Sequence, residues 1–350
     1  MNLLTEDVMK VKTKRTLAVI AAILTVVIVA YLVIALIPRP DNFKLENPMQ
    51  KSGELPILIA HGGGNKEFPD NTLEAFYNAY SVDQRVMMET DVSITKDGVV
   101  ILSHDTTLDR KTNVTGAIAD HNYSDLIANE VNFGYTNPTE SGSLSGERKL
   151  FKNPDGNEVT PLDVEYPEGV SARHETVFLA TTLEELIVAF PNNRINVEIK
   201  QSGELGKTAF REIVRLLEKY DAFDRVVLAS FHGEIYDEFK RCQKEGELPE
   251  TFMYSPGTAG AATYFILQTL GLDLFFTDGI AALQLPMEEY GFNLATKRLV
   301  SNAHEHNIAV HYWTINDKED MRYLIDIGAD GIMTDYPHRL AEVYAEYNGN

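Results

Sequence analysis

Residues 57–76 read ILIAHGGGNKEFPDNTLEAF, an apolar run followed by a histidine, three glycines and an amphipathic segment. The run 57–60 has the length and composition of a buried strand, and the segment 72–80 has the apolar spacing of a helix. Thr72 follows Asn71 at the point where a helix cap is expected. Glycine lets the backbone turn sharply or approach a ligand closely, so this stretch predicts a strand, a tight turn and a helix.

The same alternation continues along the chain. Short apolar runs typical of buried strands alternate with amphipathic helical stretches. About eight strands over ~290 residues predict a (β/α)8 TIM barrel, with a doubly wound parallel sheet as the alternative. The predicted strands are 57–60, 86–92, 98–103, 195–199, 226–231, 251–255, 280–285, 308–313 and 331–334, and the predicted helices include 72–80, 182–190, 207–220, 296–306 and 318–327.

The stretch 129–180 departs from this alternation. It contains NPTESGSLSGERKLFKNPDGNEVTP, which is rich in the Gly, Ser, Asn and Pro residues typical of loops. We expect an insertion of loops and short strands that covers or borders the functional site. A surface elaboration without a functional role is the alternative.

An uncharged apolar segment precedes the predicted barrel. Residues 16–37, TLAVIAAILTVVIVAYLVIALI, are long enough to cross a bilayer core, which takes roughly 20 helical residues. A cleaved signal peptide has a shorter apolar core, so the length favours a retained transmembrane helix. A buried helix of a soluble domain is disfavoured, because the segment is apolar all round and has no caps.

Basic residues flank this segment unequally, four before it and two shortly after it. The positive-inside rule then predicts a single-pass protein of the cell membrane, with residues 1–15 in the cytoplasm and the barrel outside. We expect residues 38–55 to form a linker and residues 56–345 to form the barrel domain. The basic residues are Lys10, Lys12, Lys14, Arg15, Arg39 and Lys44.

Composition and charge limit the possible partners. The chain has 350 residues, of which 44% are hydrophobic and 24% charged, an ordinary globular composition. Its formal net charge of -21 repels phosphate backbones, so we do not expect nucleic acid as a partner. Cys242 is the only cysteine, which excludes an internal disulfide and a cysteine-rich zinc site.

Polar residues stand at the ends of several predicted buried strands, where a barrel gathers its loops on one rim. Carboxylates two apart on a strand point to the same side, and several held together repel one another unless a cation binds. Their oxygen atoms suit Ca²⁺ or Mg²⁺, whereas the alternative is a structural cluster of ion pairs with Lys200. The residues at these ends are His61, Glu89, Asp91, His104, Asp105, Glu198, Lys200, Trp313 and Asp335.

Two histidines, His61 and His104, come from different predicted strand ends. A single histidine is more often structural, but two beside a carboxylate cluster can take and give a proton near neutral pH. Hydrolysis of a phosphate ester uses such a pair. A cation and Lys200 would stabilise the charge on the phosphoryl oxygens.

Seven motifs follow the order found in the glycerophosphodiester phosphodiesterase family, which the chain resembles from about residue 55 to about residue 337. The block 89–116 is the most specific part. The resemblance implies a TIM barrel, a divalent cation and hydrolysis of glycerophosphodiesters to sn-glycerol 3-phosphate and an alcohol. The motifs are AHGGG, DNTLEAF, METDVSITKDGVVILSHDTTLDRKTNVTG, TTLEEL, NVEIK, WTIN and GADGIMTDYP.

The resemblance also implies roles for individual residues. His61 and His104 match the acid and base histidines of the family, and Lys200 matches a basic residue near the phosphate. Trp313 matches an aromatic residue of the substrate pocket, although a lone buried tryptophan is otherwise most often core. The family's metal ligands correspond to Glu89, Asp91 and Glu198.

Two positions depart from the family pattern. Gly62 stands where the family usually has Arg, and Asp70 stands where it usually has Glu. Loss of the Arg removes a bidentate phosphate clamp. We expect Gly62, Gly63 and Gly64 to let backbone N–H groups approach the phosphate instead, whereas a tight turn without a ligand is the alternative.

Three functions stay open on the sequence. The first is hydrolysis of a soluble glycerophosphodiester, and the second is phospholipase D-like hydrolysis of a lysophospholipid or membrane glycolipid, which the anchor favours. The third is non-catalytic binding of a glycerophosphoryl group, which the changes at Gly62 and Asp70 suggest. The attacking group is open as well, because either water or a glycerol hydroxyl of the substrate can attack the phosphorus.

Overall fold

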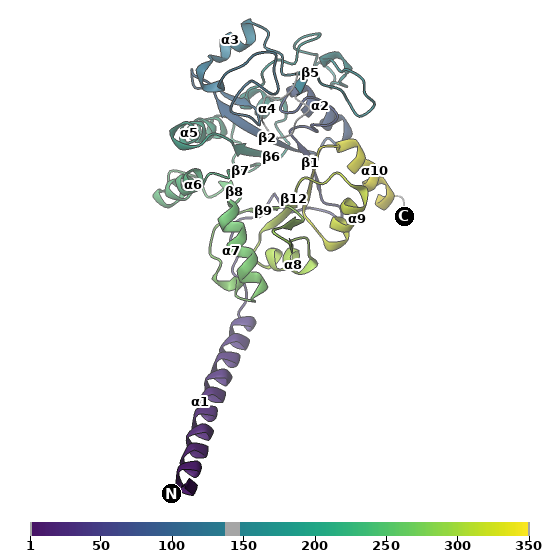
Figure 1. Ribbon diagram of the computed structural model, residues 1–350. Coiled ribbons are helices and arrows are strands. Elements are labelled where there is room, and N and C mark those ends of the chain that lie inside the picture. The colour runs from purple at the N-terminus through teal and green to yellow at the C-terminus, as the bar shows by residue number, and fades with distance from the viewer. Residues whose placement is uncertain (1, 137–147, 349–350) are drawn as a thin grey trace.

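The computed structural model describes residues 2–136 and 148–348, and its centre is a barrel of eight parallel strands (Figure 1). The strands are ordered β8-β7-β6-β2-β1-β13-β12-β9, and the Ala281 N–H donates to the Tyr254 carbonyl (3.1 Å) across the remaining gap. The first strand pairs with the last, which confirms the TIM barrel and excludes a doubly wound sheet. The barrel strands are β1 (Ile57–His61), β2 (Met87–Ile94), β6 (Ile195–Ile199), β7 (Val226–Ala229), β8 (Met253–Tyr254), β9 (Ala282–Leu285), β12 (Ala309–Tyr312) and β13 (Gly331–Thr334).

A helix follows each barrel strand on the outside of the barrel (Figure 1). Helix caps lie where the sequence predicts them: Thr182 and Glu185 form a capping box, and Asp317 accepts from the first N–H groups of its helix. The helices are α2 (Leu73–Val82), α4 (Leu183–Ala189), α5 (Gly203–Lys219), α6 (Gly233–Glu245), α7 (Thr258–Thr269), α8 (Lys297–Glu305), α9 (Lys318–Ile327) and α10 (Pro337–Asn348).

The predicted strand 98–103 is not one of the eight barrel strands. Its ordered part, β3 (Val100–Leu102), runs antiparallel to the end of β2, and Leu102 pairs with Val92. An apolar run has the same composition in either direction, so the prediction of a barrel strand was wrong here. The reversal brings the chain back to the rim, where the Ser103 N–H donates to the Asp91 carbonyl (2.8 Å).

The predicted insertion lies between β3 and α4. Its described part contains few regular elements, in agreement with its loop-like composition, and residues 137–147 of it lie outside the described residues. The short elements between β3 and α4 are η1 (Ile118–Asp120), α3 (Tyr123–Ala128), β4 (Tyr135–Thr136), β5 (Lys149–Leu150) and η2 (Pro161–Asp163).

The segment before β1 packs against the N-terminal end of the barrel. Phe43 and Met49 are buried in the apolar cluster inside the barrel. The Asn47 side chain donates to the carbonyls of Ala281 (2.7 Å) and Asn307 (2.8 Å), just before β9 and β12. This segment therefore covers one end of the barrel and leaves the C-terminal end for a site.

Helix α1 (Asn2–Leu36) projects away from the barrel (Figure 1). Its part Thr13–Leu36 is exposed, and it is long and apolar enough to be a membrane span or a signal sequence. The chain just after α1 is tied to the barrel, because Arg39 Nε lies 2.6 Å from Asp273 Oδ2 in a nearly buried ion pair.

Candidate active site

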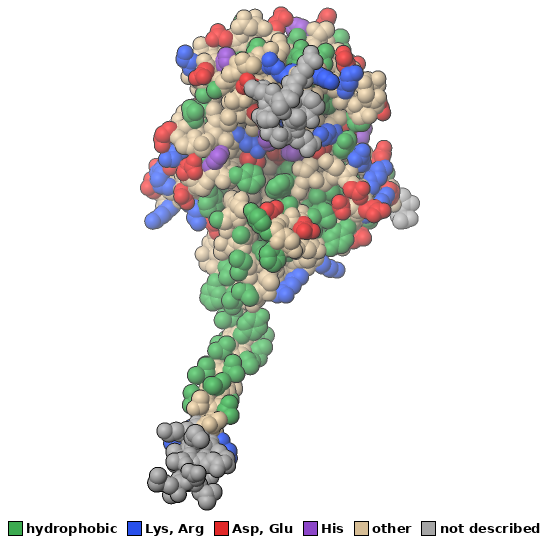
Figure 2. All heavy atoms as spheres, in the orientation of Figure 1, with side chains coloured by type: hydrophobic (Ala, Val, Ile, Leu, Met, Phe, Trp, Pro, Cys, Tyr) green, Lys and Arg blue, Asp and Glu red, His purple; other side chains and the backbone are tan. Residues whose placement is uncertain are grey.

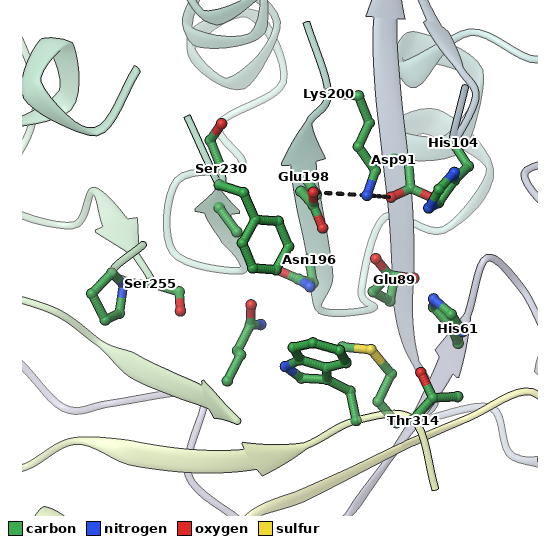
Figure 3. Close-up of a pocket in the computed structure, with 16 residues that line it drawn as sticks. His61, Glu89, Asp91, His104, Asn196, Glu198, Lys200, Ser230, Ser255 and Thr314 are labelled. Carbon is green, nitrogen blue, oxygen red and sulfur yellow. Dashed lines mark ion pairs between the residues drawn. The ribbon is translucent and has the colours of Figure 1, made fainter. Parts of the chain in front are cut away.

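A pocket of about 240 Å³ opens at the C-terminal end of the barrel (Figure 3). It brings together every predicted catalytic, metal-ligating and substrate-binding residue except Gly62 and Gly63, which lie in the turn after β1. The side chains come from separate strands and from the loops that follow them. The lining residues are His61, Glu89, Asp91, His104, Asn196, Glu198, Lys200, Ala229, Ser230, Phe231, Ser255, Pro256, Gln284, Trp313, Thr314 and Met333.

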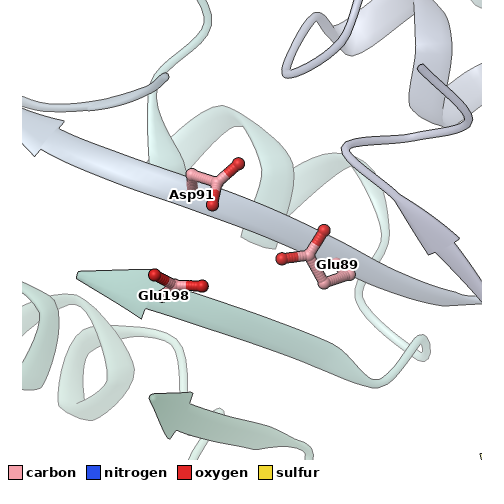
Figure 4. Close-up of side chains that lie close together, drawn as sticks. All are labelled: Glu89, Asp91 and Glu198. Carbon is pink, nitrogen blue, oxygen red and sulfur yellow. The ribbon is translucent and has the colours of Figure 1, made fainter. Parts of the chain in front are cut away.

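Three carboxylates form a cluster in this pocket, two of them buried and the third, Glu198, partly buried (Figure 4). Glu89 and Asp91 lie on β2, and Glu198 lies on β6 in register with Asp91. One oxygen atom from each carboxylate lies within 4.8 Å of the others. Burial and the charge of Asp91 raise the pKa of Glu89, against the opposing charge of His61.

Lys200 occupies one side of this cluster. Its Nζ lies 2.9 Å from Asp91 Oδ1 and 2.7 Å from Glu198 Oε1 (Figure 3). Burial opposes the ammonium charge, but the two carboxylates outweigh burial and raise the pKa of Lys200. Glu89 instead accepts a hydrogen bond from the Gly62 N–H (2.8 Å). Within residues 2–136 and 148–348, Lys200 therefore pairs with two of the three carboxylates, whereas the third is held by a backbone N–H.

His61 ends β1 and is oriented by Asp335, which follows β13. Its Nδ1 lies 2.6 Å from Asp335 Oδ1, while Asp335 Oδ2 accepts from the Asn316 side-chain amide (2.8 Å). Burial alone would lower the pKa of His61, but the hydrogen bond to Asp335 and the charge of Glu89 raise it to about 9. With Nδ1 engaged, Nε2 is the ring atom left for proton exchange.

His104 has the same kind of partner in the next residue. Its Nδ1 lies 3.0 Å from Asp105 Oδ1, and Arg110 holds Asp105 through two hydrogen bonds (2.7 and 2.8 Å). The hydrogen bond to Asp105 raises the pKa of His104 against the effect of burial. The two histidines thus share one arrangement, in which a carboxylate orients the ring from the Nδ1 side.

Asn71 orients Asp91, a role that was not predicted from the sequence. Its side-chain carbonyl accepts from the Thr90 hydroxyl (2.7 Å) and the Asp91 N–H (3.1 Å), and its amide donates to Asp91 Oδ2 (3.1 Å). Asn71 has φ 59°, a left-handed conformation that Asn tolerates better than most residues. The one sequence feature that could have indicated this role is the position of Asn71 directly before the helix cap Thr72.

The glycine turn after β1 is closed by bonds within the protein. The Gly62 N–H donates to Glu89, and the Gly63 N–H donates to the Ala60 carbonyl (3.1 Å). Gly63 has φ 85°, and a Cβ there would lie 2.7 Å from the Ala75 Cβ. The turn therefore needs glycine for its conformation and its close packing, and a contact of these N–H groups with phosphate stays a prediction.

A second hollow of about 550 Å³ lies on the other side of the two histidines. Arg110 and Lys111 line it, and Lys111 pairs with the buried Asp70. These two cations lie near the turn in which the sequence lacks the family's Arg. The described part of the insertion borders the same hollow through Thr136, Phe151 and Lys152.

Two further polar side chains face the first pocket. Asn196 Oδ1 and Gln284 Nε2 are buried and have no hydrogen-bond partner within residues 2–136 and 148–348. Unpaired buried polar atoms are costly, and a bound ligand is one way to satisfy them. Both lie on strands, β6 and β9, but their sequence surroundings gave no signal for a pocket position.

The TIM barrel thus holds two carboxylate-paired histidines beside a cluster of three carboxylates in one pocket. The profile of the glycerophosphoryl diester phosphodiesterase family matches residues 61–339, and the chain belongs to this family. The match confirms the resemblance carried by the sequence motifs, and it makes the protein an enzyme that hydrolyses phosphoric diesters.

Two relatives match over most of the chain. Lysophospholipase D GDPD3 from Homo sapiens is 26% identical over 322 residues, which cover 87% of this chain and 86% of that protein. A glycerophosphodiester phosphodiesterase from Bacillus altitudinis is 24% identical over 293 residues, which cover 83% of this chain and 98% of that protein.

Solved structures show the same fold. A phosphodiesterase from Oleispira antarctica, in complex with the product sn-glycerol-3-phosphate, has a TM-score of 0.56 and 21% identity, with 83% of this chain and 97% of that chain covered. A glycerophosphodiester phosphodiesterase from Agrobacterium tumefaciens has a TM-score of 0.54 and 15% identity, with 82% and 100% covered. At these low sequence identities, the structural similarity establishes the barrel fold alone.

Proposed function

We propose that the protein hydrolyses a glycerophosphodiester to sn-glycerol 3-phosphate and an alcohol, using a divalent cation and His61 and His104. The observation that carries this proposal is the pair of carboxylate-oriented histidines beside the three-carboxylate cluster in one pocket. The name of the Bacillus altitudinis relative, a glycerophosphodiester phosphodiesterase, supports this substrate class. The Homo sapiens relative is named a lysophospholipase D, which supports hydrolysis of a lysophospholipid as the second candidate function.

The three carboxylates fit a hard divalent cation. Two oxygen ligands of one Ca²⁺ ion lie at most roughly 5 Å apart, twice the Ca²⁺–oxygen distance. The oxygens of Glu89, Asp91 and Glu198 lie within 4.8 Å of one another, so they are close enough to share one ion. We propose Ca²⁺ or Mg²⁺ as this ion, in competition with Lys200 for Asp91 and Glu198.

The histidines move the protons of the reaction. A bound cation draws negative charge from the phosphoryl oxygens. One histidine takes the proton from the attacking oxygen, and the other protonates the alkoxide that leaves when its bond to phosphorus breaks. Asp335 and Asp105 hold the two rings so that the Nε2 atoms are available for this exchange.

Other predicted residues position the substrate. Lys200 would add a positive contact to the phosphate, and Trp313 would pack against the part of the substrate next to it. The N–H groups of Gly62 and Gly63 are the proposed replacement for the missing Arg, although the Gly62 N–H already donates to Glu89 and the Gly63 N–H to the Ala60 carbonyl. Arg110 and Lys111, in the adjacent hollow, are further sources of positive charge.

We propose that residues 16–37 anchor the enzyme in the cell membrane, with residues 1–15 in the cytoplasm and the domain 56–345 outside. The apolar helix and the excess of basic residues before it support this orientation. Residues 38–55 connect the anchor to the domain and pack against the N-terminal end of the barrel.

The full-length protein in detergent should release sn-glycerol 3-phosphate and choline from glycerophosphocholine. His61→Ala and His104→Ala should each lower kcat by roughly 100-fold or more, because each removes a proton-transfer group. His338→Ala is the matched control, since His338 Nδ1 pairs with Glu67 (2.7 Å) outside the pocket. Full activity in either pocket variant would contradict the proposal, and a phosphorus NMR signal of a cyclic phosphate would identify the glycerol hydroxyl as the attacking group.

A further inference from the structure

Helix α7 carries no charge on its exposed side. Residues 251–272, which include the whole helix, contain no Asp, Glu, Lys or Arg. Within the described helix, the exposed positions recur at helical spacing and are occupied only by threonine, alanine and isoleucine, up to Leu270 at its C-terminal end. The preceding helix α6 shows the ordinary pattern, because its exposed side carries Glu234, Asp237 and Lys240. An outer helix face without charge indicates that this face is not made for water alone.

The apolar surface continues from α7 into the short helix η3 (Asp273–Phe275), which packs against the end of α7. Ile266 and Leu270 on the α7 side are 55% and 54% exposed, and Phe275 on the η3 side is 58% exposed. We call these three side chains the base patch. Large apolar side chains that are exposed together at one corner of a domain mark an interaction surface.

Two contacts hold this corner of the domain against the end of α1 (Figure 1). Arg39 donates through Nη1 to the Ile34 carbonyl (3.1 Å) in the last turns of α1, and through Nε to Asp273 Oδ2 (2.6 Å) in η3. Gly271, between α7 and η3, lies against Tyr31 of α1, because a Cβ at Gly271 would lie 2.5 Å from the Tyr31 hydroxyl. Figure 2 shows hydrophobic side chains continuing from the base of the domain onto α1.

These contacts set the depth of the base patch relative to the proposed membrane span. The apolar part of α1, Thr13–Leu36, has 24 residues. At 1.5 Å per residue it is roughly 36 Å long, slightly more than the roughly 30 Å hydrocarbon core of a bilayer. Tyr31 lies roughly 7 Å before its end, close to the boundary between hydrocarbon and head groups, where tyrosine is typical. Since Gly271 lies against Tyr31, the base patch is at the level of the bilayer surface.

We propose that the base patch inserts into the bilayer interface beside α1, as a second membrane contact of the domain. This inference rests on the proposed anchoring by residues 16–37. Arg298 of α8 lies next to the patch, because its Nη2 donates to the Gln268 carbonyl (3.1 Å) near the end of α7, and it is exposed toward the level of the head-group phosphates. A single span can tilt in a bilayer, and a second contact limits this tilt. Docking therefore fixes the orientation of the barrel and the position of its pocket relative to the membrane.

A second copy of the chain is the competing partner for the same patch. A protein partner would account for the exposed apolar side chains, but not for their position beside Tyr31 and Arg39 at the end of the span. The bilayer accounts for both observations, because the surface of the domain that meets the span is also the surface without charge. The test must separate contact with lipid from contact with protein.

The test uses spin labels on full-length protein in phosphatidylcholine nanodiscs. Collision rates are measured with oxygen, which concentrates in lipid, and with a water-soluble nickel chelate. The labels are attached at Leu270→Cys and Phe275→Cys, while Val26→Cys on α1 reports the anchor, and unlabelled wild type is the blank because Cys242 is buried. Val188→Cys on α4, 54% exposed, is the matched control. The ratio of oxygen to nickel collisions should be high at the two patch positions, as at Val26, and low at Val188.

Each result assigns success or failure to a separate claim. Nickel access at the patch with Val26 still shielded would overturn the inference and leave the anchor standing. Low collision rates with both reagents would show that protein covers the patch and would overturn it too, whereas nickel access at Val26 would refute anchor and inference together. Phe275→Asp should bring the Leu270 label into water and leave glycerophosphocholine hydrolysis in the same nanodiscs unchanged. Lack of hydrolysis by the wild type would refute the proposed reaction without affecting the docking result.

Discussion

The Nδ1 atom of His61 lies 2.6 Å from Oδ1 of Asp335, so the first and last strands of the barrel together fix one histidine of the site. His104 and Asp105 repeat this relationship from a loop outside the barrel strands. In both pairs the carboxylate stabilises the charged ring and sets the direction of Nε2. The proton chemistry of the pocket therefore depends on residues that need not touch the substrate.

Replacement of Asp335 tests this dependence. Asp335→Asn keeps the size of the side chain and removes its charge, so the pKa of His61 should fall from about 9. We expect kcat/KM on glycerophosphocholine to drop by roughly 10- to 100-fold, as for other residues that orient a catalytic group. The limb of the pH–rate profile that reports His61 should move to lower pH. A drop in rate with an unmoved profile would assign Asp335 a purely structural role.

The buried pair of Asp70 and Lys111 should make stability depend on pH. Burial opposes the Asp70 charge, but the charge and hydrogen bond of Lys111 lower the pKa of Asp70 to about 2. The stabilisation is present above the unfolded-state pKa, roughly 4, and is lost as the pH falls toward 2. It amounts to about 2–3 kcal/mol in the free energy of unfolding.

Urea unfolding of full-length protein in detergent at pH 7 and pH 3 measures how much the Asp70–Lys111 pair contributes to the free energy of unfolding. Asp70→Asn should be less stable than the wild type at pH 7 and should lose less stability on going to pH 3. Asp155→Asn, at an exposed loop position, is the control and should behave as the wild type. An unchanged pH response in Asp70→Asn would show that the pair contributes nothing to acid sensitivity.

The glycine turn should tolerate no side chain at Gly63. Gly63→Ala combines a left-handed φ of 85° with a Cβ only 2.7 Å from the Ala75 Cβ. Gly98→Ala is matched in conformation, with φ 86°, but its Cβ would meet nothing within 4 Å. We expect Gly98→Ala to cost about 1 kcal/mol in unfolding free energy and Gly63→Ala at least about 2 kcal/mol more. If both variants lose the same amount of melting temperature, close packing does not explain why position 63 is a glycine.

Replacing Gly62 by the Arg that the family usually has should not improve the enzyme. Gly62 has φ 56°, and a Cβ there would lie 3.0 Å from the Asp70 Cβ. The turn also directs the Gly62 N–H at Glu89, so we expect Gly62→Arg to lower kcat/KM rather than raise it. A rise in kcat/KM on glycerophosphocholine would show that the missing guanidinium is a deficit that the turn can accommodate.

The sequence predicted the barrel because buried parallel strands and amphipathic helices have distinct periodicities. The same logic predicted that His61, Glu89, Glu198 and Trp313 would meet on one rim, and they line one pocket. Composition carries no information on strand direction, which is why β3 was predicted as a barrel strand.

Partners that depend on folding were harder to predict. Asp335 stood out at a strand end, but only the closed barrel shows that it reaches His61, 274 positions away in the chain. The only signal for Asn71 was its place directly before the helix cap Thr72, and its role comes from a left-handed backbone. Gln284 gave no signal, since its role comes from its position on β9 at the pocket.

Cation dependence of the activity is the most direct test of the proposed metal site. Full-length protein would be stripped with chelator and assayed on glycerophosphocholine with Ca²⁺, Mg²⁺ or Mn²⁺ restored separately, beside Glu89→Gln, in which one proposed ligand loses its charge. We predict that chelation abolishes turnover, that one cation restores it, and that Glu89→Gln requires at least tenfold more cation for half-maximal activity. Undiminished turnover in the chelated wild type, or restoration of both proteins at the same cation concentration, would contradict a cation site at Glu89, Asp91 and Glu198.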